Sequence, residues 1–139
     1  DHAHAELSPQ EVLDVFTNTY VNINNHVKLV DYHFTRGDVM AADVAVEIDG
    51  KAMNLTATGN GRLDAVANAI RQQLHLQFSD LTYEEHALTQ GSASQAITYV
   101  SITLPDGKKV WGAGIHDDII ASSINALFSA INRTIEGGK

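Results

Sequence analysis

Apolar residues near the start of the chain recur every three to four positions, which is the period of one face of an α-helix. They are Val12, Val15, Phe16 and Tyr20. Ser8 and Glu11 have the spacing of a capping box, in which each side chain binds the backbone amide of the other residue. A short helix is therefore predicted over residues 8–20. The polar residues 22–25 end this pattern and are typical of a hinge.

From residue 27 onward the period changes to two, which is typical of strands with one buried face. Strands are predicted over residues 27–36, 39–48 and 51–58, separated by the glycine turns of two hairpins. The second strand collects its apolar residues on one face: Met40, Ala42, Val44, Val46 and Ile48. A helix should cover this face, and the following segment carries an apolar stripe at helical spacing: Leu63, Val66, Ala67, Ile70 and Leu74.

The second half of the chain repeats this order. Strands are predicted over residues 76–88, 95–104 and 108–114, and a longer helix follows with a wider apolar arc. The predicted fold class is α+β, with two pseudo-symmetric βββα units over about 26–75 and 76–136. Each unit is an antiparallel three-stranded sheet covered by a helix, and the short N-terminal helix precedes both.

Both units carry a G-x-G before their helix, at residues 59–61 and 112–114. Backbone amides at the positive end of a helix can bind a small anion such as a carboxylate. Neither segment has the third glycine of a dinucleotide site or the Lys-Ser/Thr of a phosphate loop, so nucleotide binding is disfavoured. Two interpretations stay open for the acidic residues Asp64, Asp117 and Asp118: they cap the helices, or one of them receives an ammonium group.

Composition narrows the function further. The 139 residues, 44% of them apolar, are enough for one domain with an ordinary core. The net charge of −8 disfavours nucleic-acid binding, and no apolar run is long enough for a membrane. The chain contains no cysteine, which excludes disulfides and thiolate catalysis and suits a cytoplasmic protein. The polar start of the chain also lacks the pattern of a signal peptide.

Candidate chemistry is sparse. His2 and His4 form one possible metal-binding pair, and Glu84 and His86 share a face of a predicted strand. Two ligands without a third make a poor zinc site, so no metal is expected. There is no G-x-S-x-G elbow, and the serines of residues 91–95 are predicted to lie in a loop. A binding or regulatory domain is therefore favoured over an enzyme.

Three segments make the pattern specific: GNGRLDAVANAI (59–70), YEEHALTQGSASQAITYV (83–100) and WGAGIHDDIIASSINALFSAINR (111–133). Together they resemble the C-terminal regulatory domain of 2-isopropylmalate synthases, the LeuA dimerisation domain, over residues 7–135. The resemblance implies a homodimer that binds the end-product leucine and inhibits a remote active site. That site belongs to a TIM-barrel catalytic domain of the same polypeptide, which uses a divalent metal to condense acetyl-CoA with 2-oxoisovalerate.

The barrel lies outside this sequence, so the resemblance implies no catalysis, cofactor or metal for the chain itself. Residues 1–25 would be the end of the linker subdomain, and residues 26–139 would form the regulatory domain. The residues implied to bind leucine are Gly59, Asn60, Gly61, Leu63, Asp64, Tyr83, Ala87, Ser94, Gly112, Gly114 and Ile119. Two alternatives stay open: a domain that senses isoleucine, as in citramalate synthases, and a dimerisation module without a ligand.

Overall fold

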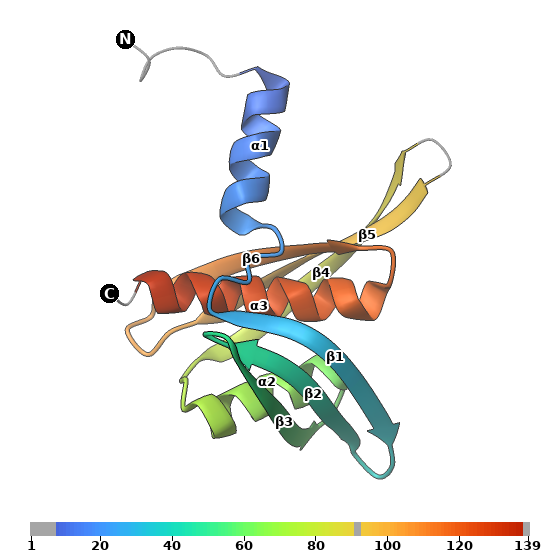
Figure 1. The fold of residues 1–139 in the computed structure, drawn as a ribbon, viewed down its shortest axis with the longest axis vertical. Coiled ribbons are helices and arrows are strands. Elements are labelled where there is room, and N and C mark those ends of the chain that lie inside the picture. Colours follow the sequence, from blue (N-terminus) through green and yellow to red (C-terminus); the bar gives the residue numbers. More distant parts are fainter. Residues whose placement is uncertain (1–7, 91–92, 138–139) are drawn as a thin grey trace.

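The computed structural model describes residues 8–90 and 93–137 and contains two antiparallel sheets. The elements of the first half are α1 (Pro9–Tyr20), β1 (Val27–Arg36), β2 (Met40–Ile48), β3 (Lys51–Gly59) and α2 (Arg62–Leu74). Those of the second half are β4 (Ser79–Gln90), β5 (Ala93–Thr103), β6 (Lys109–His116) and α3 (Ile119–Gly137). Each sheet keeps its strands in chain order and is followed by a helix (Figure 1). The predicted pair of βββα units is confirmed.

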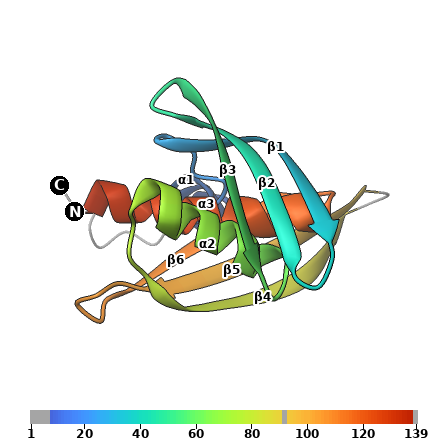
Figure 2. The same ribbon diagram turned by 90° about the horizontal axis from the view of Figure 1, so that it is seen from below.

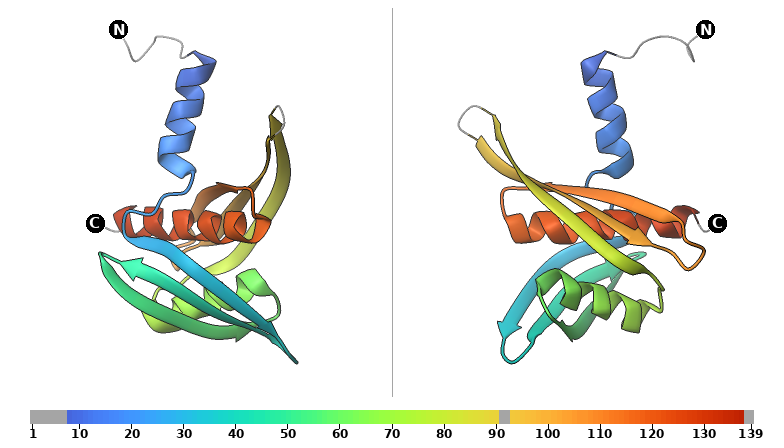
Figure 3. Two further views of the ribbon diagram at one scale, coloured as in Figure 1. Left: turned by 45° about the vertical axis from the view of Figure 1, so that its right-hand side comes forward. Right: turned by 180° about the vertical axis from the view of Figure 1, so that it is seen from behind.

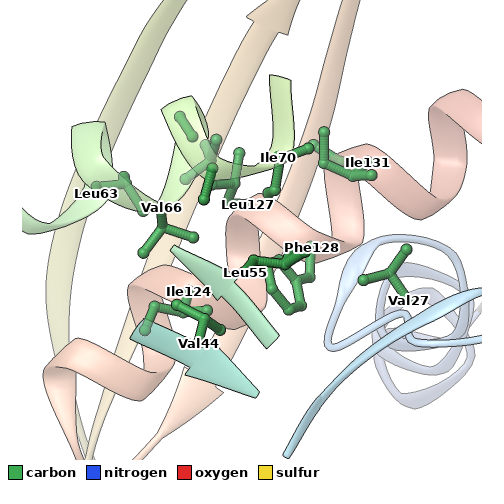
Figure 4. Packing of buried hydrophobic residues seen from close by; sticks show 14 of the residues in the cluster. Val27, Val44, Leu55, Leu63, Val66, Ile70, Ile124, Leu127, Phe128 and Ile131 are labelled. Atoms are coloured by element: carbon green, nitrogen blue, oxygen red, sulfur yellow. The ribbon is translucent and has the colours of Figure 1, made fainter. Parts of the chain in front are cut away.

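Helices α2 and α3 lie between the two sheets (Figure 2). Helix α2 packs on β2 and β3, whereas α3 packs on β5 and β6 and also contacts β1 and α2. Side chains of both units consequently share one core, in which Leu55, Val66 and Ile70 of the first unit lie near Ile124 and Leu127 of the second (Figure 4). The wide apolar arc of α3 therefore has two packing partners, as its sequence indicates.

A β-bulge changes which side of β1 faces the core. The pairing of Leu29 with Val46 is followed by that of Asp31 with Ala45, so Val30 is an extra residue on β1. Val30 is 56% exposed, and beyond it the inward positions shift by one. As a result Tyr32 and Phe34 pack against the core although strict alternation from Val27 would point them outward.

Helix α1 starts with the predicted capping box. The backbone N of Ser8 donates to Glu11 Oε1 at 3.0 Å, and the backbone N of Glu11 donates to Ser8 Oγ at 3.1 Å. The hydrogen bonds from Ser8 lower the pKa of the Glu11 carboxyl. The N-terminal part of the helix projects from the rest of the molecule, as does the far end of the β4–β5 hairpin (Figures 1 and 3). The second half of α1 contacts the rest of the chain, with Phe16 beside Tyr99 of β5 and Tyr20 beside Arg133 of α3. No helix in residues 8–90 and 93–137 is long and apolar enough to cross a membrane.

The segment after α1, which is predicted to be a hinge, makes hydrogen bonds to β6 and α3. Asn22 extends the edge of β6: its backbone N donates to Ala113 O at 2.8 Å, and its side chain bonds the backbone N and O of Ile115. The backbone N of Ile23 donates to Ser129 Oγ at 2.7 Å. These contacts fix the point at which α1 leaves the sheet.

Asn132 of α3 completes this attachment from inside the core, where it is fully buried. Its Oδ1 accepts hydrogen bonds from the backbone N of His26 at 2.9 Å and of Val27 at 2.7 Å. Its Nδ2 donates to the backbone O of Ile23 at 2.7 Å and of Val27 at 2.8 Å. One side chain therefore binds four backbone groups of the connection between α1 and β1.

Candidate functional site

The first glycine segment forms the turn between β3 and α2. Gly59 lies so close to the helix that an added Cβ would be 2.6 Å from the backbone N of Ala65. Gly61 occupies the N-cap position with extended backbone angles of φ −143° and ψ −179°, and it has no side chain to cap the helix. The first amides of α2 consequently keep free donors at the positive end of the helix.

The start of α3 is capped by a side chain instead. Asp118 Oδ1 accepts from the backbone N of Ile120 at 3.0 Å, so the capping interpretation of Asp118 is confirmed. Its other carboxylate oxygen accepts from the hydroxyl of Tyr32, which joins β1 of the first unit to α3 of the second. This hydrogen bond lowers the pKa of the Asp118 carboxyl. Burial of the Tyr32 side chain raises the pKa of its hydroxyl to about 12, and the hydrogen bond to Asp118 is the second largest cause.

The second glycine segment lies inside the predicted strand 108–114, so its amides are not at the start of α3 as expected. Both residues lie within β6, opposite Val100 and Thr98 of β5. Backbone groups of Ala113 point to the outer edge, where its O accepts from Asn22, so those of the flanking glycines point to β5. Their amides belong to the sheet, and neither glycine lines the cavity at the starts of α2 and α3.

A cavity of about 360 Å³ lies where the starts of α2 and α3 meet β4 and the β1–β2 turn. Its lining residues are Arg36, Met40, Gly61, Arg62, Leu63, Tyr83, Glu85, Ile119, Ile120, Ser123 and Ile124. The walls combine apolar side chains with backbone and charged groups, as small-molecule sites do. Tyr83 is 55% exposed and Ile119 is 49% exposed, so the cavity is open to solvent on their side.

Charges of both signs line the cavity. Glu85 of β4 accepts a hydrogen bond from Ser123 Oγ of α3 at 3.0 Å. Arg62 stands at the first position of α2, with its guanidinium 5.9 Å from the centre of the Phe34 ring. Arg36 contributes a second guanidinium from the end of β1. An arrangement of this kind can bind a small molecule that carries both an anionic and a cationic group.

The family model of the LeuA allosteric (dimerisation) domain matches residues 6–135. The chain belongs to this family. It is 48% identical to the 2-isopropylmalate synthase of Desulfitobacterium hafniense (strain Y51), over 98% of the chain and 24% of that relative. It is 44% identical to the 2-isopropylmalate synthase of Helicobacter hepaticus (strain ATCC 51449 / 3B1), over 97% of the chain and 26% of the relative.

A more distant relative has the same description. The 2-isopropylmalate synthase of Mycobacterium ulcerans (strain Agy99) is 34% identical over 92% of the chain and 23% of its own length. The chain thus spans about a quarter of the length of the curated relatives it matches.

This LeuA-type domain brings part of the predicted leucine site together. Gly61, Leu63, Tyr83 and Ile119 all line the cavity. The other predicted residues lie elsewhere. Gly59 packs under α2, and Asn60 and Asp64 are exposed beside the cavity, in the turn and in the first turn of α2.

Ala87 and Ser94 lie farther along the β4–β5 hairpin, where both are exposed. Ala87 pairs with Ala96, and Ser94 pairs with Thr89. The loop prediction for residues 91–95 needs correction, because β5 already begins at Ala93; residues 91 and 92 lie outside the described part of the chain. Neither Ala87 nor Ser94 is part of the cavity lining.

The sequence patterns did not predict that Glu85 lines the cavity, nor that residues at the β1–β2 turn do. The alternation of β4 could have indicated that Glu85 lies beside Tyr83 at the site, because residues 83, 85 and 87 share one face of a strand. No local pattern points to Arg36 and Met40, since they come from the other unit and reach the cavity only through the packing of the two sheets.

The histidines form no metal site in the part of the chain that the structure describes. His86 Nε2 lies 3.9 Å from Glu84 Oε2, and no group of three potential ligands is present among the described residues. His2 and His4 lie outside those residues.

Proposed function

We propose that this chain is the leucine-binding regulatory and dimerisation domain of a 2-isopropylmalate synthase and mediates its feedback inhibition. Residues 1–25 would be the end of a linker toward the catalytic domain of the same polypeptide. The family match and the names of the relatives support the type of enzyme. The metal and the condensation of acetyl-CoA with 2-oxoisovalerate would belong to that catalytic domain.

The cavity between the two units is the observation that carries the proposal. Its size of about 360 Å³ lies within the ~300–1,000 Å³ typical of small-molecule sites. The uncapped amides after Gly61 suit the carboxylate of an amino acid. Leu63, Ile119 and Ile124 provide apolar contacts for a branched side chain.

The position of the cavity also suits regulation. Met40 and Leu63 come from the first unit and Ile119 and Ile124 from the second, so a bound ligand would touch both units. Helix α3 leads from this cavity to Asn132, which holds the connection to α1. Inhibition requires that leucine bind one arrangement of the domain more tightly than another, by about 1–3 kcal/mol in typical allosteric proteins.

Calorimetry and thermal unfolding of the 139-residue chain with millimolar leucine, isoleucine and valine test the proposal. We expect binding heat and a raised melting temperature, both largest with leucine. A preference for isoleucine would support an isoleucine sensor of the citramalate synthase type instead. No response to any of the three, with a dimer in light scattering, would indicate a dimerisation module without a ligand.

A substitution at the cavity wall gives a second test. We expect Tyr83→Trp to abolish the leucine response because the larger ring fills the opening of the cavity. His86→Trp is the matched control, since His86 is exposed on the opposite face of the same strand. A leucine response that survives Tyr83→Trp and disappears in His86→Trp would place the site on the other face of β4.

A further inference from the structure

We infer that Glu85 selects the ligand class of the cavity: its carboxylate receives the ammonium group of the bound α-amino acid. This inference rests on the proposed function, since it concerns the same cavity. It predicts that the domain distinguishes an amino acid from the α-hydroxy or α-keto acid with the same side chain. Nothing in the sequence pattern of the two glycine segments assigns this role to Glu85.

The position of the Glu85 carboxylate supports this role. Oε2 lies 3.0 Å from the hydroxyl of Ser123, which has the backbone O of Ile119 as a second acceptor at 3.0 Å, so the Glu85 side chain points toward the start of α3. In the described part of the chain, the other carboxylate oxygen has no hydrogen-bond partner and no lysine, arginine or histidine nitrogen lies within 4.0 Å of the carboxylate. A carboxylate can accept several hydrogen bonds, so an ammonium group can bind there without displacing Ser123.

The acidic residues near the two helix starts are less suited to this role. Asp118 uses one oxygen for the backbone N of Ile120 and the other for the Tyr32 hydroxyl. Asp117 lies 2.8 Å from His116 Nδ1 and does not line the cavity. Asp64 is exposed on α2, also outside the lining. Among the described residues that line the cavity, Glu85 is the only acid.

The charges around the cavity indicate where the anionic and the cationic end of the ligand would bind. The uncapped start of α2 and the Arg62 guanidinium favour an anion on one side of the cavity. Glu85, on β4, favours a cation on another side. A zwitterion can satisfy both sides at once, whereas an α-hydroxy acid leaves the Glu85 charge without a cation.

The test compares leucine with 2-hydroxy-4-methylpentanoate, which replaces the ammonium group by a hydroxyl. Affinities of both compounds are measured by calorimetry for the wild-type chain, Glu85→Gln and the control Glu84→Gln. Glu84 is on the opposite face of β4 and outside the cavity lining. We expect Glu85→Gln to weaken leucine binding about ten- to hundredfold, as for the loss of a charged hydrogen bond. Binding of the hydroxy acid should change less than about threefold, and Glu84→Gln should match the wild type.

Ser123→Ala provides a second variant that keeps the charge and removes the hydrogen bond that positions it. We expect a smaller loss of leucine affinity, by severalfold, with the same selectivity pattern. If wild-type protein binds leucine and Glu85→Gln discriminates the two compounds equally well, this inference is overturned while the proposed function stands. If the wild-type chain binds neither compound, the proposed function fails and the inference fails with it.

Discussion

The two glycine segments have the same order in the sequence and different tasks in the structure. Gly61 lies in an open turn, where an added Cβ would meet no atom within 4 Å. Gly114 lies under α3, where an added Cβ would be 2.1 Å from the backbone O of Ser122. At Gly112 the same distance to the backbone N of Ala130 is 2.3 Å. Gly61 shapes a helix start, whereas Gly112 and Gly114, like Gly59 under α2, allow a helix to approach a sheet closely.

The difference explains why the cavity is lined by the start of α2 rather than by the second glycine pair. Polar side chains of α3 use the close approach: Ser122 Oγ bonds Gly114 O at 2.9 Å, and Ser129 Oγ bonds Ala113 O at 3.1 Å. The buried residues of α2 are all apolar. The second unit therefore binds its helix to β6 by buried hydrogen bonds and caps its start with Asp118, whereas the start of α2 has no side-chain cap.

The largest predicted effect distinguishes Gly114, under α3, from Gly61, in the open turn. Gly114→Ala should lower the free energy of unfolding by about 4 kcal/mol, because the new methyl group meets the α3 backbone and the helix must shift. Gly61→Ala should stay within about 1 kcal/mol of the wild type, since its poorer capping and the lower entropy of the unfolded chain oppose each other. Urea unfolding of both variants measures the difference, and equal costs would contradict the packing role of β6.

The second prediction compares an asparagine of each helix. Asn132→Ala should cost about 2–3 kcal/mol, because it leaves the buried backbone N of Val27 without its acceptor. Asn68 of α2 donates to Thr58 O at 2.8 Å at the surface, so Asn68→Ala should cost about 1 kcal/mol or less. Asn132→Ala should also speed amide hydrogen exchange in residues 23–27. Normal protection of this segment would show that the attachment does not depend on Asn132.

The third prediction concerns the pair that joins the two units. Tyr32→Phe should cost about 1 kcal/mol at pH 7. The folded-state pKa of Asp118 is lowered, so its contribution is full above the unfolded value of about 3.9 and is lost as the pH falls below it. The pKa of Tyr32 is raised to about 12, so its contribution is full below the unfolded value of about 10 and is lost as the pH rises toward 12.

Unfolding free energies of wild type and Tyr32→Phe at pH 3, 7 and 11 check both limits. The difference between the two proteins should be largest at pH 7 and smaller at the two extremes. A difference that is the same at all three pH values would show that the hydroxyl contributes packing alone.

The smallest predicted effect on stability makes the two helix starts more alike. Gly61→Ser adds a capping hydroxyl to α2, where space is available, and should raise the free energy of unfolding by about 0.3 kcal/mol. The same hydroxyl occupies an amide that we propose for the leucine carboxylate, so leucine affinity should fall about fivefold. Unchanged leucine affinity in this more stable variant would exclude these amides from the site.

Local patterns in the sequence determined most of the secondary structure. Periods of 3.6 and 2 depend only on which residues share a face, so β2 and α2 could be predicted from their own residues. The capping box of Ser8 and Glu11 and the cap by Asp118 are equally local, because the groups that bond lie within three residues of each other.

Only the tertiary structure determined which residues line the candidate site. The bulge at Val30 turns Tyr32 toward Asp118, and the packing of β6 under α3 places Gly112 and Gly114 in the sheet, outside the lining of the cavity. The contact of Glu85 with Ser123 spans 38 positions of the chain. Such contacts depend on how whole elements pack, and a pattern over a few neighbouring residues contains no information about the distance between elements that are far apart in sequence.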